Sequence, residues 1–109
     1  MLDVCLLGTG GMMPLPYRWL TSLMMRYNGK SILCMGDLGI EGEKYLLTMY
    51  GEEELDCDVL KVGHHGSKYS STAEFLKVVS PKIAVISCGK DNSYGHPHKE
   101  LLDRLKEAG

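Results

Sequence analysis

The chain has 109 residues, of which 44% are hydrophobic and 24% are charged, and its formal net charge is −2. This length predicts one domain with a modest core, and the composition is that of a soluble protein. The charge gives no general attraction to nucleic acid, so such a substrate would need a local basic patch or metal ions. No run of about 18 apolar residues occurs and the N-terminus lacks a basic region, so we expect no membrane span, no signal peptide and a cytoplasmic location.

The first third of the chain is predicted to hold three strands. Residues 2–7 predict a first strand that ends at a glycine cluster, and residues 12–19, with two prolines, predict a loop. Residues 21–27 and 31–35 predict two further strands. Asn28-Gly29 between them predicts a hairpin, because a type I′ turn needs positive φ at both positions. The glycine cluster is no dinucleotide motif, since the third glycine of G-x-G-x-x-G would fall at Met13.

The middle of the chain begins an α-β-α-β-α order. Residues 41–50 predict a helix that ends at Gly51, and residues 52–56 predict an acidic, solvated connector. Residues 59–62 include the β-branched Val59 and Val62 and predict the strand that precedes a pair of histidines.

The last third of the chain completes this order. Residues 71–74 form a capping box that predicts a helix to about residue 79, and residues 82–87 predict another strand. Pro97 fits the first position of a last helix. That helix carries three leucines on one face, at Leu101, Leu102 and Leu105.

The four cysteines are widely spaced and form no C-x-x-C pair, which excludes a zinc ribbon. Cys5, Cys34 and Cys88 lie inside or beside apolar runs, as is typical of buried free thiols. This pattern favours a reducing compartment.

The run from Asp58 to Ser67 is the most informative part of the chain, because its strand ends in Gly63-His64-His65-Gly66. Imidazole binds zinc, manganese and iron, and flanking glycines allow close approach to an ion. Adjacent strand residues point to opposite faces, so one histidine would be structural. If the strand ends at Gly63, the loop could turn both inward. We therefore predict that at least one of the pair faces a cleft.

Asp37 follows a predicted strand in Cys34-Met35-Gly36-Asp37. Its carboxylate could ligate or bridge metals. The alternative is an aspartate that caps the helix beginning near Gly39, and on this residue alone the cap is favoured.

Gly95-His96-Pro97-His98 places two more imidazoles after the next strand. They would lie on the same side of a parallel sheet as the first pair, which is consistent with one shared cleft. The alternative is that His96 caps the last helix and His98 is a surface residue of its first turn.

Several polar residues precede the helix that is predicted after the histidines. A helix N-terminus favours an anion such as phosphate, although a capped helix without a ligand is the favoured interpretation. The residues concerned are Ser67, Lys68, Ser70 and Ser71.

Together these motifs resemble the metallo-β-lactamase fold. Residues 36–109 resemble the C-terminal half of the metallo-hydrolase domain of ComEC/Rec2 competence proteins, through 36–38, 58–67, 80–87 and 94–98. Residues 1–33 resemble the start of bacterial ribonuclease Z, through 1–14 and 18–23. The resemblance implies a single truncated domain over 1–109, a partial αββα sandwich in which 1–33 and 34–109 come from different parts of the fold.

The resemblance also implies a function. Asp37, with His64 or His65, would bind a divalent metal, zinc or manganese, for hydrolysis of a phosphodiester such as nucleic acid. Ser67, His96 and His98 would contact the substrate. The family's main metal motif, H-x-H-x-D-H, is absent from this sequence, so the residues present suffice for one ion or none. The alternative is a non-catalytic remnant that self-associates through exposed strand edges. The resemblance also implies that the parent domain, that of the ComEC proteins, is tethered to a membrane.

Overall fold

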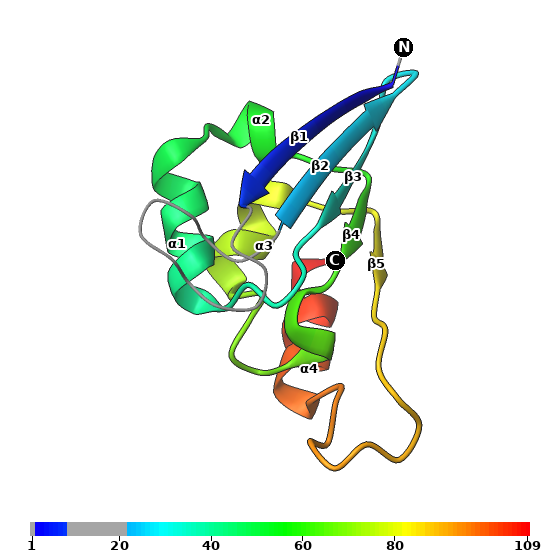
Figure 1. Ribbon diagram of the computed structural model, residues 1–109. Helices are drawn as coiled ribbons and strands as arrows, with labels where there is room; N and C mark the ends of the chain where they lie inside the picture. Colours follow the sequence, from blue (N-terminus) through cyan, green and yellow to red (C-terminus); the bar gives the residue numbers. More distant parts are fainter. Residues whose placement is uncertain (1, 9–21) are drawn as a thin grey trace.

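The computed structural model describes residues 2–8 and 22–109, which form one sheet with helices packed on one side (Figure 1). The strands are β1 (Asp3–Gly8), β2 (Ser22–Tyr27), β3 (Lys30–Cys34), β4 (Val59–Lys61) and β5 (Ile83–Val85). The helices are α1 (Ile40–Met49), α2 (Glu52–Leu55), the 3₁₀ turn η1 (Gly63–Gly66), α3 (Ala73–Val79) and α4 (Lys99–Ala108). None of the helices described is long and apolar enough to cross a membrane.

The five strands follow one another in the order β1-β2-β3-β4-β5. The first three pair antiparallel, and β3, β4 and β5 pair parallel. The predicted hairpin is confirmed, because Asn28 and Gly29 both have positive φ and Tyr27 pairs with Lys30. The predicted mixed α/β architecture, a hairpin followed by α-β-α-β-α, is also confirmed.

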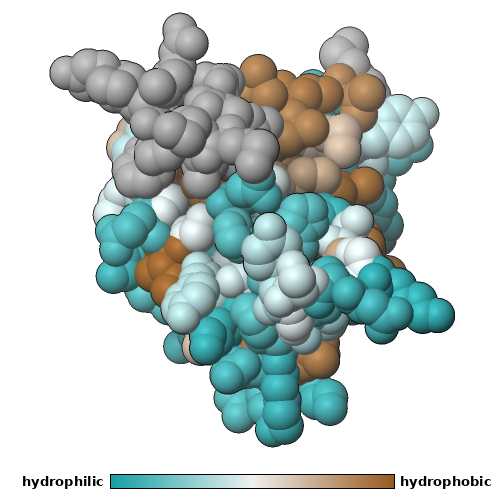
Figure 2. Space-filling view, turned by 60° about the horizontal axis from the view of Figure 1, so that its bottom comes forward, coloured by the Kyte–Doolittle hydropathy of each residue, from teal (hydrophilic) through white to brown (hydrophobic). Residues whose placement is uncertain are grey.

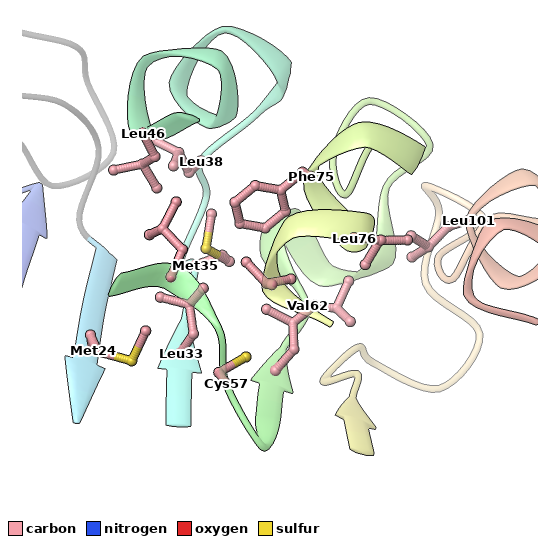
Figure 3. Close-up of a cluster of buried hydrophobic side chains, with 13 residues drawn as sticks. Met24, Leu33, Met35, Leu38, Leu46, Cys57, Val62, Phe75, Leu76 and Leu101 are labelled. Atoms are coloured by element: carbon pink, nitrogen blue, oxygen red, sulfur yellow. The ribbon is translucent and has the colours of Figure 1, made fainter. Parts of the chain in front are cut away.

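The core lies between the sheet and the helices, as Figure 3 shows. Met24, Leu33 and Leu60 sit side by side on β2, β3 and β4 and are all buried. Opposite them the helices contribute apolar side chains that are at most 1% exposed, namely Leu46, Leu55, Phe75, Leu76, Val79 and Leu101. This single layer of helix on sheet is half of the sandwich that the sequence predicted.

The other face of the sheet is apolar and exposed. Side chains alternate along a strand, so Val4, Ile32 and Ile83 fall on the face opposite Leu33 and Leu60. Val4 is 56% exposed, Leu6 60% and Ile83 58%. Figure 2 shows hydrophobic surface gathered between the two grey parts of the molecule, where β1 lies. We call this surface the open face; its rows are Val4-Met25-Ile32-Val59-Ile83 and Leu6-Leu23-Cys34-Lys61-Val85.

The segment predicted as an acidic, solvated connector at residues 52–56 does expose its acidic side chains, but it also forms the short helix α2, which was not predicted. Its three glutamates occupy the first turn, where the helix dipole favours negative charge. Leu55 turns inward and is only 1% exposed, so this one side chain attaches the segment to the core.

Two predicted helix starts are displaced by one or two residues. The N-cap of α3 is Thr72, whose side chain accepts a hydrogen bond from the Phe75 amide at 3.2 Å, rather than Ser71. Helix α4 begins at Lys99, so Pro97 precedes the N-cap instead of occupying the first helical position.

The prediction of buried thiols, made for Cys5, Cys34 and Cys88, is wrong for Cys5 and Cys88 and only partly met by Cys34. Cys5 and Cys88 are exposed and Cys34 is half-buried, whereas Cys57 is buried. Cys5 lies on the edge strand β1, Cys34 on the open face and Cys88 in the loop after β5, none of which the helices cover. Burial raises the pKa of the Cys57 thiol to about 11, helped by the charges of Asp56 and Asp58. The predicted proline loop, and residues 9–21 of the ribonuclease Z resemblance, lie outside the described residues.

Candidate metal centre

The predicted site residues come from the loops that follow β3, β4 and β5. Because these strands are parallel, their carboxyl ends meet at one edge of the sheet. A pocket of about 550 Å³ lies there. It is lined by Asp37, His64, His65, Cys88, Gly89, Asn92, Tyr94 and His96. Figure 2 brings this end of the molecule forward and shows a mostly hydrophilic surface.

Both histidines of the pair line the pocket, because β4 ends at Lys61 and the chain then turns sharply. His64 and His65 both have left-handed backbone conformations, with φ of 53° and 55°. Such a conformation costs a non-glycine residue about 1–3 kcal/mol and persists only where surrounding contacts impose it. Here the His64 amide donates to the Gly36 carbonyl at 2.7 Å, and the Ser67 amide donates to the His64 carbonyl at 3.1 Å.

A buried carboxylate and a guanidinium hold the far end of this loop. Glu43 of α1 is 1% exposed and accepts hydrogen bonds from the Ser71 and Thr72 amides. Arg104 of α4 donates to the carbonyls of Lys68, Ser70 and Ser71. The loop after β4 is therefore fastened to α1 and α4 as well as to the sheet.

A carboxylate of the chain itself already lies at the N-terminus of α3. The Ser71 and Thr72 amides, just before the helix, donate to Glu43, and the Phe75 amide donates to the Thr72 side chain. Ser67 is 1% exposed, and its hydroxyl accepts a hydrogen bond from the Tyr69 amide at 3.1 Å. Ser70 is buried and donates to the Gly63 carbonyl at 2.9 Å. The structure shows a capped helix, which is the interpretation that the sequence favoured. Contact between Ser67 and a substrate stays a prediction.

Asp37 does not cap α1. The N-cap of that helix is Gly39, and no side chain provides the cap. The carboxylate instead faces His65, with 3.7 Å between Asp37 Oδ1 and His65 Nε2. Asp37 therefore lines the pocket beside His65, and its role as a metal ligand stays a prediction.

The ring of His65 is fixed by a backbone carbonyl. His65 Nδ1 lies 2.9 Å from the Ser87 carbonyl oxygen, which can only accept, so Nδ1 carries the proton of the neutral ring. In that tautomer the lone pair of Nε2 faces the Asp37 carboxylate, and a protonated ring would form an ion pair with the same carboxylate. Two electron-pair donors facing each other favour a cation between them, and a metal-binding histidine commonly donates its other ring N–H to a carbonyl.

Asn92 shapes the loop after β5. Its side-chain oxygen accepts from the Tyr94 and His96 amides, and its nitrogen donates to the Gly89 and His96 carbonyls. The side chain thus fixes both ends of the His96 peptide unit, which keeps this histidine at the pocket.

The two histidines of this loop have different surroundings. His98 Nδ1 accepts from the Lys68 amide at 2.9 Å, and its Nε2 donates to the Tyr94 carbonyl at 3.0 Å, so backbone groups use both ring nitrogens. The His96 ring lies 6.0 Å from that of His64. Desolvation, then the neighbouring imidazoles, lowers the pKa of His96, which favours a neutral ring with a free lone pair. His98 is also the N-cap of α4 but provides no side-chain cap.

The residues fit part of a metal site. Within residues 2–8 and 22–109, no three His, Cys, Asp or Glu side chains are close enough to hold an ion together. Asp37 and His65 form a pair suited to a divalent cation, and His64 and His96 lie across the same pocket. The predicted ligands Asp37, His64 and His65 thus line one pocket, and metal binding by them stays a prediction.

Cys88, Asn92 and Tyr94 line the pocket but were not predicted as site residues. The sequence marks residues 88–95 only as a polar stretch with two glycines. Nothing in its pattern indicates that an asparagine would organise the loop.

A family model and several curated proteins are similar to this chain in sequence. Residues 3–90 match the family model described as "Metallo-beta-lactamase superfamily". The chain is 45% identical over 84 residues to ComE operon protein 3 of Bacillus subtilis, and 43% identical over 81 residues to Competence protein ComA of Neisseria gonorrhoeae. These alignments cover 77% and 74% of this chain but only 11% and 12% of the relatives.

A second group of relatives carries the name Ribonuclease Z. The protein of Lachnospira eligens is 49% identical over 71 residues, which is 65% of this chain and 22% of the relative. This alignment of 71 residues is longer than the 33-residue segment for which the sequence predicted similarity to ribonuclease Z. The predicted boundary between residues 33 and 34 is not tested by it and stays a prediction. The chain spans about a tenth to a quarter of the curated relatives it matches. It belongs to the metallo-beta-lactamase superfamily.

Proposed function

We propose that this chain is part of a metal-dependent phosphodiester hydrolase and contributes one side of its metal site. The observation that carries the proposal is the facing pair of Asp37 and His65, with the His65 ring fixed by Ser87. The names of its relatives, competence proteins and ribonuclease Z, support a nucleic-acid substrate.

The residues would have distinct roles. A divalent cation, zinc or manganese, supplies Lewis-acid activation of water and of a phosphoryl oxygen. Asp37 and His65 would hold it, and His64 would complete the histidine side of the pocket. His96 would contact the phosphodiester by donating a hydrogen bond from a ring N–H, which the neutral imidazole also carries. His98 would act by holding the loop, since its ring nitrogens are already paired.

We infer that the chain alone is weakly active or inactive. The sequence has no H-x-H-x-D-H motif, and the described residues form no group of three ligands. A catalytic site with about three protein ligands to each metal would need donors from outside this pocket. A cytoplasmic location also stays a prediction.

Hydrolysis of bis(p-nitrophenyl) phosphate tests the activity. With added manganese or zinc, we expect slow turnover that EDTA removes and that Asp37→Ala abolishes. The matched control is Asp103→Ala, because Asp103 lies in α4 and pairs with Lys99 away from the pocket. Turnover that survives Asp37→Ala would contradict the assignment.

Self-association is a second candidate, supported by the strand edges. In the described sheet β1 pairs only with β2 and β5 only with β4, and the open face adds exposed apolar surface beside both edges. Sedimentation velocity would show a dimer that Leu6→Lys weakens. Leu2→Lys is the control, since Leu2 is similarly exposed but precedes β1. A monomer at all concentrations would exclude this candidate.

A further inference from the structure

Tyr94 is a large aromatic side chain that is 74% exposed at the pocket. A single exposed aromatic residue is ordinary. Tyr94 differs because the chain holds it in place beside the candidate metal ligands.

The backbone of Tyr94 is fixed on both sides. Its amide donates to Asn92 Oδ1 at 3.1 Å, and its carbonyl accepts from His98 Nε2 at 3.0 Å. The other nitrogen of His98 accepts from the Lys68 amide, in the loop that Arg104 fastens. The ring is therefore displayed from a fixed backbone, which lowers the entropy lost on binding.

Tyr94 also belongs to an aromatic stack that leads into the pocket. Its ring lies 5.6 Å from that of His96 with an interplanar angle of 25°. The His96 ring in turn packs edge-on against His98 at 4.8 Å and lies 6.0 Å from His64. A planar group stacked on Tyr94 would extend this series.

We propose that Tyr94, supported by His96, is a stacking subsite for a nucleobase of a single-stranded nucleic acid whose phosphodiester lies in the pocket. This assignment rests on the proposed function. Every base has a π-face, so an exposed aromatic ring binds bases with little sequence preference. The pocket volume of about 550 Å³ suits a ligand the size of one nucleotide. The net charge of −2 gives little electrostatic attraction, so stacking should form a large share of the affinity.

Fluorescence anisotropy in EDTA tests the subsite without hydrolysis. The probes are labelled eight-nucleotide oligothymidylate, oligouridylate and an abasic strand of the same length and charge. We expect the 109-residue chain to prefer a base-bearing strand over the abasic strand by about fivefold to 100-fold. A preference with either the DNA or the RNA strand supports the subsite and identifies the nucleic acid.

Variants separate stacking from other effects. Tyr94→Ala should remove the preference, whereas Tyr94→Trp should keep it. Tyr69→Ala is the matched control, because Tyr69 is 62% exposed but does not line the pocket. Equal affinity for base-bearing and abasic strands, no binding of either, or a preference that survives Tyr94→Ala would overturn the proposal.

The failure of this proposal is distinguishable from failure of the hydrolase proposal. Asp37→Asn should abolish metal-dependent hydrolysis while the base preference in EDTA persists. A chain that prefers bases but never hydrolyses a phosphodiester would refute only the hydrolase. A chain that hydrolyses but shows no base preference would refute only the subsite.

Discussion

The two loops that meet at the pocket are built differently. The loop after β4 carries buried residues such as Gly63, Gly66 and Ser70, and it is held by Glu43 and Arg104 from distant helices. The loop after β5 remains mostly exposed and is organised by Asn92 within the loop. One side of the site is therefore continuous with the core, and the other depends on local hydrogen bonds. Substitutions in the first should affect stability, and substitutions in the second should affect the site alone.

Glu43→Ala should give the largest loss of stability. It leaves the buried Ser71 and Thr72 amides without their acceptor, and an unsatisfied buried group costs about 1–3 kcal/mol. We expect the free energy of unfolding in urea to fall by about 2–4 kcal/mol. Glu41→Ala is the control, since Glu41 is an exposed acid of the same helix. Equal effects of the two substitutions would show that the buried carboxylate does not fasten the loop.

Gly66→Ala tests the contact between the two loops. Gly66 has a φ of 84°, and a Cβ there would lie 2.9 Å from Pro97 Cβ and 3.1 Å from Pro97 Cα. Both the left-handed backbone and the contact disfavour alanine. We therefore expect the free energy of unfolding, measured by heat or urea, to fall by about 2 kcal/mol. Gly51→Ala has open space and should change stability little. A stable Gly66→Ala variant would mean that the loops do not pack as described.

Asn92→Ala should loosen the loop of the site while it changes the stability of the protein little. The substitution removes four hydrogen bonds, but the loop is mostly exposed and water can replace them. We therefore expect the free energy of unfolding to fall by about 1 kcal/mol or less. Hydrogen exchange at the Tyr94 and His96 amides should nevertheless rise at least tenfold. The exposed neighbour Ser93 provides the control variant Ser93→Ala. Unchanged exchange would contradict the role given to Asn92.

The smallest expected effect is a pH dependence of stability through Glu43. Desolvation raises the pKa of Glu43, although hydrogen bonds from Thr72 and Ser71 and the charge of Arg104 act in the opposite direction. A carboxyl whose pKa is higher in the folded state contributes stability below its unfolded pKa, and loses it as pH rises through the folded value. Stability of the wild type relative to Glu43→Gln should therefore fall as pH rises above about 4.5. A constant or rising difference would contradict this environment for Glu43.

Local patterns predicted the elements well, and long-range contacts explain what they missed. The Asn28-Gly29 hairpin and the strands before Asp37 and His64 follow from turn chemistry and β-branched runs. The direction of His64 and His65 could not be predicted, because it depends on a left-handed turn imposed by Gly36 across 28 residues of chain.

Other misses have a similar cause. Leu55 anchors α2 because α3 lies opposite it. The carboxylate that accepts from the Ser71 and Thr72 amides belongs to the distant Glu43 and not to the local Glu74. The cysteines were misjudged because an apolar run predicts a strand but not whether anything covers that strand.

The central claim is that Asp37 and His65 together bind a divalent cation, and isothermal titration with zinc and with manganese tests it most directly. We expect one ion per chain, with the affinity lowered at least about tenfold by Asp37→Asn or by His65→Ala. Asp103→Asn, in the exposed Lys99 pair, should titrate like the wild type. An absence of binding, or an affinity that neither Asp37→Asn nor His65→Ala changes, would contradict the account.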